Sequence, residues 1–244
     1  NYVSRRPPLR PGAGEHLAEQ EAGAERAMVY RQMGVACLND GQDEAAAAHL
    51  EQAISGDVPD PAAAGILEKI YRSHGDWAGI VRVLDVQASV TDDTADKVKK
   101  LKDAAHIELQ TRHNRQAAGA FFARILEAYP AHEEALKFQV EHLYEEGDYG
   151  AAVPLCEALE PFLSELDADD FDVQLELSTF YFRFAEMLRF LGRDEEAMRR
   201  YEQTLNFNPT HLPSLQVVGP LYMATSEWTK AERVYRRLLQ LTGG

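Results

Sequence analysis

Two short clusters contain side chains that could bind a metal ion. His106 lies two residues before Glu108, and His132 precedes Glu133 and Glu134. A metal site needs three or four converging ligands that further hydrogen bonds hold in place. Neither cluster supplies such a set by itself, and the other histidines are scattered along the chain. We therefore predict solvated or turn histidines and no metal site.

Sequence motifs for catalysis are also missing. The chain contains no Gly-rich phosphate loop, no G-x-S-x-G, no H-E-x-x-H and no C-x-x-C. We expect its many carboxylates on solvated helix faces rather than in acid–base pairs. The sequence thus predicts no catalytic residues, no cofactor and no enzymatic activity.

The charge balance narrows the classes of partner. The 40 Asp and Glu residues exceed the 25 Lys and Arg residues, for a net charge of −15. Nucleic acids and anionic membrane surfaces both need clustered cations, so we expect neither as a partner. No segment is apolar over the length that spans a bilayer, and no signal peptide is recognisable, which predicts a cytoplasmic protein. Residues 1–14 are rich in proline and arginine and are typical of a linker or tail.

A 34-residue spacing recurs along the chain between turn-like positions. The turns separate apolar-periodic segments, and their spacings are 34 (41 to 75), 38 (75 to 113), 34 (113 to 147), 45 (147 to 192) and 34 (192 to 226). A repeat of this length is typical of a helix–turn–helix unit that buries its apolar face only by stacking on neighbours. The six turn positions are Gly41, Gly75, His113, Gly147, Gly192 and Ser226.

The residues around each turn follow one pattern. A small or apolar residue that would let two helices approach lies five positions after the turn, and a larger one lies four positions further on. Cys37 and Cys156 fall at core positions of repeats three apart, so we expect two unpaired thiols. The small or apolar positions are Ala46, Ile80, Ala118, Ala152, Ala197 and Ala231, and the larger ones are Leu50, Leu84, Phe122, Cys156, Tyr201 and Tyr235.

This pattern resembles the tetratricopeptide repeat family, whose signature is W-x2-L-G-x2-Y, then A-x3-F, then P. The resemblance implies an all-α fold of about thirteen helices, arranged as a right-handed superhelical α-solenoid of six repeats. It also implies a segment of a longer, bacterial-type repeat protein. The best match is the fifth repeat, with Tyr181, Phe184, Ala185, Leu188, Ala197, Tyr201 and Pro209 at the seven signature positions.

The repeat boundaries predict one solenoid over residues 15–244. The long fourth interval carries an acidic insertion near residues 161–171, which is either a tolerated surface loop or a partner-specific element. We expect the first helix of the fifth repeat to begin early and to be longer than its counterparts. The repeats lie near 27–60, 61–94, 99–132, 133–166, 178–211 and 212–244.

The resemblance also implies the location of a binding site, because the first helix of each repeat lines the concave groove in this family. At these positions cations outnumber anions, and aromatic residues lie among them. Val35 stands where relatives that bind chaperone C-termini have asparagine, so that activity is not expected. The predicted partner-binding residues are Arg31, Asn39, Lys69, Arg72, Lys100, Lys137, Phe138, Tyr144, Phe182, Arg183, Arg189 and Phe190.

The predicted function is therefore a non-enzymatic scaffold that binds a peptide, helix or protein in its concave groove. The locally positive inner face favours an acidic or amphipathic partner. One alternative is a regulatory or sensing segment of a larger enzyme. Another is a structural subunit that self-associates end to end through the C-terminal helix, which has no polar capping helix after it.

Overall fold

The computed structural model describes the backbone of residues 13–243 and the side chains of residues 21–243. Within that range the regular structure is α-helical, which confirms the all-α fold, and twelve helices replace the thirteen expected. The predicted tail lies outside the described residues except for Ala13 and Gly14, which begin the first helix. That helix is continuous over 27 residues, so residues 13–39 supply one long helix and not two.

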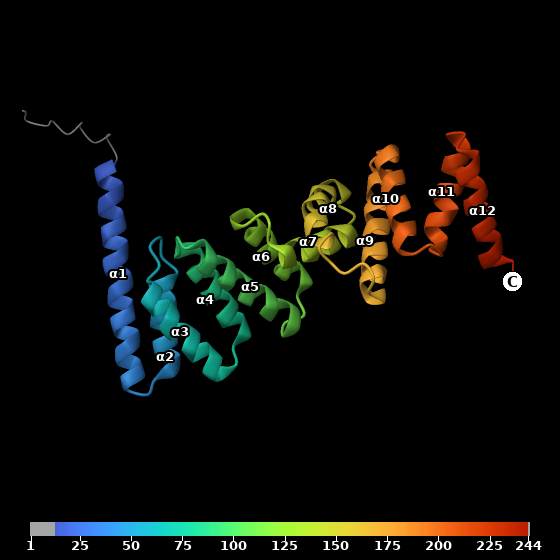
Figure 1. Ribbon diagram of the computed structural model, residues 1–244. Coiled ribbons are helices and arrows are strands. Elements are labelled where there is room, and N and C mark those ends of the chain that lie inside the picture. The colour runs from blue at the N-terminus through green and yellow to red at the C-terminus, as the bar shows by residue number, and fades with distance from the viewer. Residues whose placement is uncertain (1–12, 244) are drawn as a thin grey trace, which may run out of the picture. The chain divides into compact units, whose positions relative to one another are not determined.

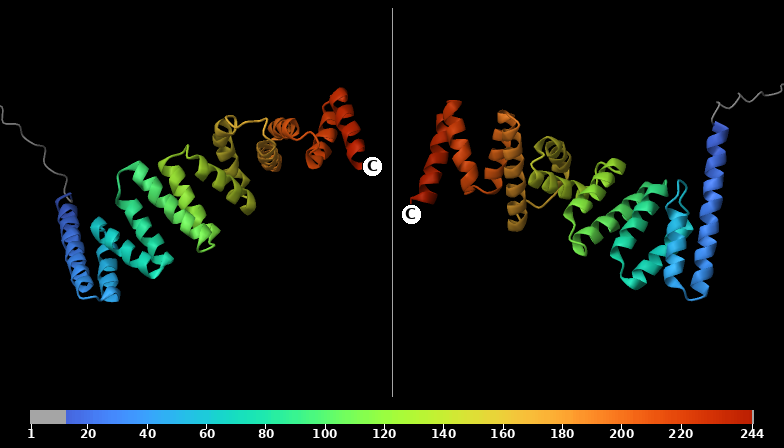
Figure 2. Two further views of the ribbon diagram at one scale, coloured as in Figure 1. Left: turned by 60° about the horizontal axis from the view of Figure 1, so that its bottom comes forward. Right: turned by 180° about the vertical axis from the view of Figure 1, so that it is seen from behind.

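The chain divides into two compact halves, an N-terminal half ending at Pro130 and a C-terminal half beginning at Ala131. In each half every helix packs against the next one in the sequence, as consecutive antiparallel neighbours (Figures 1 and 2). The N-terminal half contains α1 (Ala13–Asn39), α2 (Asp43–Ile54), α3 (Pro61–His74), α4 (Trp77–Val90), α5 (Thr94–Gln110) and α6 (Arg115–Ala128). The C-terminal half contains α7 (Glu133–Glu146), α8 (Tyr149–Leu163), α9 (Phe171–Phe190), α10 (Asp194–Phe207), α11 (Leu212–Ala224) and α12 (Trp228–Thr242).

All six predicted turn positions adopt a left-handed backbone, and no other described residue does. Glycine adopts this conformation without steric cost, which explains why four of the six turns use it. At Gly75 the turn closes α3 with two hydrogen bonds, from the Gly75 N–H to the Arg72 carbonyl (3.3 Å) and from the Asp76 N–H to the Tyr71 carbonyl (2.9 Å). The turn periodicity is therefore confirmed at the level of the backbone.

The residue after the turn often begins the next helix by capping it. The Asp76 carboxylate accepts a hydrogen bond from the Gly79 N–H (2.9 Å), and Asp148 does the same for Ala151 (3.2 Å). Such caps satisfy a backbone donor that the first turn of a helix leaves open, and each contributes about 1 kcal/mol. The Gly-Asp pairs of the sequence thus end one helix and start the next.

The core lies between the paired helices, at the positions that the repeat pattern assigned to it. All six small or apolar positions after the turns are at most 1% exposed. Of the larger ones, only Tyr235 departs from this, at 38% exposed, because it lies on the last helix of the C-terminal half. Both cysteines are unpaired, and burial raises the pKa of the Cys156 thiol to about 12, as befits a core residue.

The acidic insertion begins later than the sequence suggests. Helix α8 continues through Pro154 and Pro161 to Leu163, and turns occupy residues 164–170 before α9. Both prolines are exposed, so the carbonyls that lose a backbone partner there can bind water instead. Helix α9 spans 20 residues, which confirms the expected long first helix of the fifth repeat.

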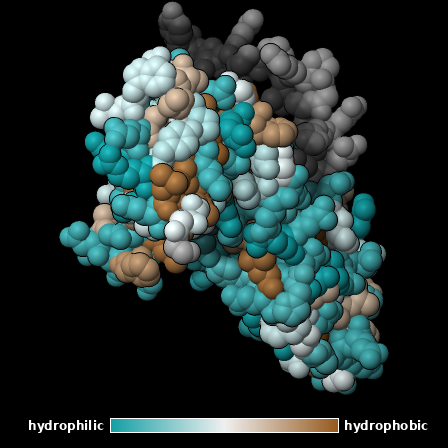
Figure 3. Space-filling model, turned by 90° about the vertical axis from the view of Figure 1, so that its right-hand side faces the viewer, coloured by the Kyte–Doolittle hydropathy of each residue, from teal (hydrophilic) through white to brown (hydrophobic). Residues whose placement is uncertain are grey.

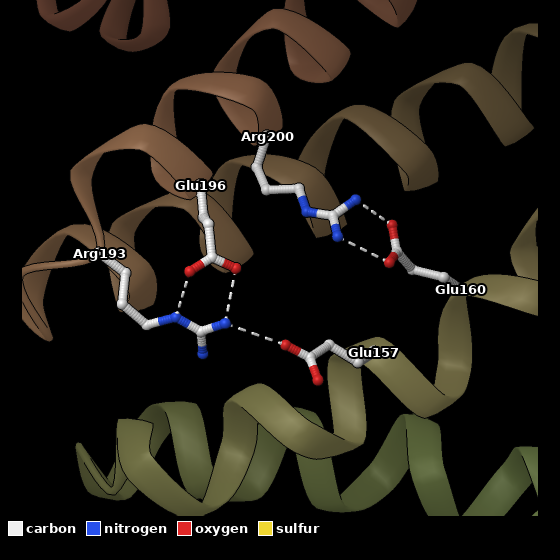
Figure 4. A network of polar contacts seen from close by, with 5 residues as sticks. All are labelled: Glu157, Glu160, Arg193, Glu196 and Arg200. Atoms are coloured by element: carbon white, nitrogen blue, oxygen red, sulfur yellow. Dashed lines mark hydrogen bonds and ion pairs between the residues drawn. The ribbon is translucent and has the colours of Figure 1, made fainter.

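Polar contacts between successive repeats reinforce the apolar packing. Four carboxylates that lie ten residues after a turn each bond to a side chain of the following repeat. Figure 4 shows one such junction, where Arg193 contacts Glu157 (3.3 Å) and Glu196 (2.6 Å), and Arg200 makes a two-point contact with Glu160. The four pairs are Glu51 with Tyr71, Asp85 with Arg124, Glu157 with Arg193, and Glu202 with Tyr222.

Candidate partner-binding groove

A cavity of about 620 Å³ lies between α7, α8 and α9 in the C-terminal half. We call it the α7–α9 groove. Its floor is apolar, and its rim carries charges of both signs. The floor consists of Phe138, Val140, Leu159, Leu163, Leu175 and Phe180, and the rim of Lys137, Glu141, Asp172, Glu176, Thr179 and Arg183.

Two ion pairs cross the rim and join α7 to α9. The Lys137 ammonium lies 3.4 Å from the Glu176 carboxylate of α9 and 3.1 Å from Glu133 of its own helix. The Arg183 guanidinium of α9 lies 3.3 Å from Glu141 of α7. All of these side chains remain at least one-third exposed, so the pairs contribute little to stability and can be rearranged by a partner.

An aromatic cluster extends the groove toward the C-terminal ends of α7 and α9. The Arg183 guanidinium lies over the Tyr144 ring, 5.3 Å from its centroid. The Phe190 ring meets Tyr149 edge-on at 5.0 Å, yet Phe190 is 74% exposed. A smaller cavity of about 290 Å³ lies among Tyr144, Tyr149, Glu186, Arg189 and Phe190. Apolar surface is therefore available here beside the paired charges.

Phe182, like Tyr144, packs at the edge of the core. It is half-buried, with its ring 4.7 Å from His211 and 6.2 Å from Tyr201. Its residue type and position resemble those of an exposed anchor, but its ring contacts His211, which precedes α11. The long-range contact with His211 could not be inferred from the repeat position alone.

His211, the neighbour of Phe182, predicts a pH dependence. It caps α11 by accepting the Ser214 N–H at Nδ1 (3.3 Å), and burial lowers its pKa below the ordinary 6.5. Because the folded state prefers the neutral ring, this stabilisation is present above the ordinary pKa and is lost as the pH falls below it. Replacing His211 by asparagine keeps a capping side chain but removes the titrating ring. We therefore expect His211→Asn to lose less stability than the wild type as the pH falls below 6.5, as measured by denaturant unfolding. An unchanged pH dependence in this variant would show that titration of His211 does not cause the loss of stability.

The predicted residues of the N-terminal half lie on α1, α3 and α5. The Arg31 guanidinium contacts Asp60 (3.3 Å), the residue that caps α3. Lys69 is exposed and makes no ion pair with a described residue, and Asn39 is exposed at the end of α1.

The other two predicted residues of this half, Arg72 and Lys100, both act on the Glu68 carboxylate. Burial acts to raise the pKa of the Glu68 carboxyl, but hydrogen bonds from Gln87 and Arg72 and the charge of Lys100 lower it overall. Arg72 lies 2.8 Å from Glu68, and Gln87 donates to it at 3.0 Å. Arg72 is thus held by a carboxylate of its own helix, and Lys100 of α5 contributes only its charge.

The expectation of a locally positive inner face needs correction for this reason. The sequence count included few of the carboxylates that lie beside the cations in the folded chain. Glu68 and Glu133 could have been recognised by their i, i+4 spacing to Arg72 and Lys137, whereas Asp60 and Glu176 come from other helices. The predicted cations that form ion pairs are Arg31, Arg72, Lys137, Arg183 and Arg189.

The last helix exposes several apolar side chains, which bears on the expected end-to-end association. Leu239 is 70% exposed and Trp228 is 59% exposed. The surface seen from the C-terminal end is nevertheless mainly hydrophilic, with separate small hydrophobic patches (Figure 3).

The described part of the chain contains neither a candidate metal site nor a candidate membrane span. Among those residues no three His, Cys, Asp or Glu side chains are grouped so that they could hold a metal ion. None of the described helices combines the length and the apolar character that crossing a membrane requires.

Comparison with known proteins finds a match to one family model, at the C-terminal end of the chain. The sequence model of the tetratricopeptide repeat matches residues 214–244, which include most of α11 and all of α12. No curated protein sequence matches the chain.

Solved structures of low sequence identity resemble the chain. The protein MamA is 13% identical over 74% of this chain and 90% of its own, with a TM-score of 0.43. Residues 41 to the end of MamA from Desulfovibrio magneticus RS-1 are 15% identical over 88% and 94%, with a TM-score of 0.38. YrrB, described as a TPR protein with an unusual peptide-binding site, is 14% identical over 86% and 98%, with a TM-score of 0.37.

Proposed function

Because this chain is a tetratricopeptide repeat protein, we propose that it binds an amphipathic segment of another protein in the α7–α9 groove. The family model matches its last repeat, and six turns with the same backbone conformation each join the two helices of a pair. Repeats of this family generally serve as protein-interaction modules. The proposal assigns that role to one surface of the C-terminal half.

The apolar floor beneath a charged rim is the observation that supports this proposal. Phe138 and Phe180 line a cavity of about 620 Å³, which is within the usual size range of ligand pockets. Exposed Phe190 lies at the aromatic end. Burial of apolar surface provides affinity at about 25 cal/mol per Å², so anchors from a partner would contribute most of the binding free energy here.

The rim favours an amphipathic partner over a uniformly acidic one. Its two cations, Lys137 and Arg183, are matched by carboxylates that include Glu141 and Glu176. A strongly acidic ligand would have to displace these carboxylates. A helix with one apolar face and mixed charges can instead exchange ion pairs with the rim while its apolar side chains enter the floor.

The aromatic residues provide the first test. We expect Phe138→Ala and Tyr144→Ala to speed dissociation and to weaken Kd by roughly 10- to 30-fold, because each removes apolar contact area from the complex. The partner is first captured with the intact chain and identified, and its binding kinetics are then measured by surface plasmon resonance. Tyr129→Ala is the matched control, since Tyr129 is 50% exposed and lies in the other half of the chain.

Charge reversal separates the rim from the floor. Arg183→Glu and Arg189→Glu should mainly change the association rate and its salt dependence, and should leave the helical content unchanged, because both side chains are at the surface. If the captured partner binds the two charge-reversal variants and the two aromatic variants as tightly as it binds the wild type, the proposed site is wrong.

A further inference from the structure

A second cleft, of about 540 Å³, lies between α10 and α12 over α11. We call it the α10–α12 cleft. Leu205, Leu215 and Val234 provide apolar lining, and four cations of α12 surround it. These cations are Lys230, Arg233, Arg236 and Arg237, all of them exposed.

Two of these four cations have a carboxylate partner, Lys230 in Glu202 and Arg236 in Glu232 of its own helix, and the other two have none in the described part of the chain. Glu202 is the acidic residue at this junction. It already accepts a hydrogen bond from the Tyr222 hydroxyl (2.6 Å) and forms an ion pair with Lys230 (3.3 Å). Arg233 and Arg237 make no ion pair with any carboxylate in the described part of the chain. They lie four residues apart on α12 and therefore share one face of that helix.

The corresponding cleft of the N-terminal half shows that this surplus is not a general property of the repeat. That cleft lies between α4 and α6 over α5 and also contains arginines. Arg124 occupies the same repeat position as Arg237, eleven residues after its turn, and it is paired with Asp85. The other two arginines are paired as well, Arg82 with Glu51 (3.1 Å) and Arg112 with Glu108.

We infer that the α10–α12 cleft is a second binding site, which takes an acidic peptide segment that also carries an apolar side chain. Carboxylates of the segment pair with Arg233 and Arg237, and the apolar side chain enters the space lined by Leu205 and Val234. Two unpaired guanidinium groups favour carboxylates here, because each new pair forms without breaking an existing one. The site is separate from the α7–α9 groove, whose cations are already paired.

A nucleic acid fits this cleft less well. Its affinity comes from many phosphate contacts with clustered cations, whereas the cleft offers two unpaired arginines on a chain with a net charge of −15. An acidic peptide needs only a local match of charge together with an apolar contact.

The experiment uses the full chain and a synthetic, fluorescein-labelled helical peptide built of Glu and Leu. We expect saturable binding by fluorescence anisotropy, and at least a tenfold weaker Kd for the double variant Arg233→Gln/Arg237→Gln. Replacing the peptide's Leu by Ser should weaken binding, and replacing its Glu by Lys should abolish it. Lys99→Gln is a control for the loss of a surface cation, because Lys99 is exposed on α5 in the other half.

Several results would overturn the inference. One is the absence of binding by the Glu/Leu peptide, and another is equal binding by the double variant at unchanged helical content by circular dichroism. A third is tighter binding of oligothymidylate, or of vesicles containing phosphatidylserine, than of the peptide. Arg183→Gln keeps the affinity for the peptide if the two sites are separate, and a loss equal to that of the double variant would place the peptide in the α7–α9 groove instead.

Discussion

Replacing Ala197 by leucine is expected to lower the free energy of unfolding by about 1–3 kcal/mol. Ala197 is 1% exposed and lies in a core cluster with Phe184, Leu188 and Tyr201. A leucine there adds three carbon atoms at a close contact between helices, so neighbouring side chains must leave their preferred rotamers. Ala231→Leu should have a similar effect, because Ala231 holds the same position in the last repeat.

Groove substitutions serve as the comparison for these two variants. Arg189→Ala removes a side chain that is 51% exposed, and we expect a change within about half a kcal/mol. The free energies come from reversible urea unfolding followed by circular dichroism. If Ala197→Leu and Ala231→Leu lost no more unfolding free energy than Arg189→Ala, the assignment of core and surface positions within the repeat would be wrong.

Two glycines of the N-terminal half should respond to alanine in opposite directions. At Gly79, a Cβ atom would lie 2.6 Å from Cδ2 of Tyr71 and 2.7 Å from the Asp76 carboxylate that caps the helix. We expect Gly79→Ala to destabilise by about 1–3 kcal/mol, since a buried ring and a cap must both move. At Gly65, in the middle of α3, a Cβ atom would meet nothing within 4 Å. Gly65→Ala should stabilise by roughly 0.5–1 kcal/mol through the lower backbone entropy of the unfolded chain.

The same urea unfolding experiment measures both glycine variants. Because alanine is the better helix former at each position, intrinsic propensity alone predicts that both variants are more stable than wild type. A stabilising Gly79→Ala would therefore show that α3 and α4 do not approach each other at this point as the structure has them.

Local features of the sequence determined the helices and their phase. A turn residue with positive φ followed by a capping aspartate, as at Gly75 and Asp76, depends on backbone sterics and on hydrogen bonds within a few residues. The burial of Ala197 also follows from its distance to the turn, because a helix has a fixed period and one apolar face. Such features can be recognised without knowing which helices meet.

Only the tertiary structure decided how the charges are distributed. Lys137 pairs with Glu176, and Arg31 pairs with Asp60. In each pair the two residues are far apart in the sequence and are brought together by the packing of helices. Counting charges at repeat positions therefore overstated the positive character of the first-helix surface. Arg237 and Arg124 hold equivalent positions, yet only Arg124 has a carboxylate partner, because Glu202 is taken by Tyr222 and Lys230. Ion pairing depends on distances of a few ångströms between side chains of different helices, and the repeat period does not determine those distances.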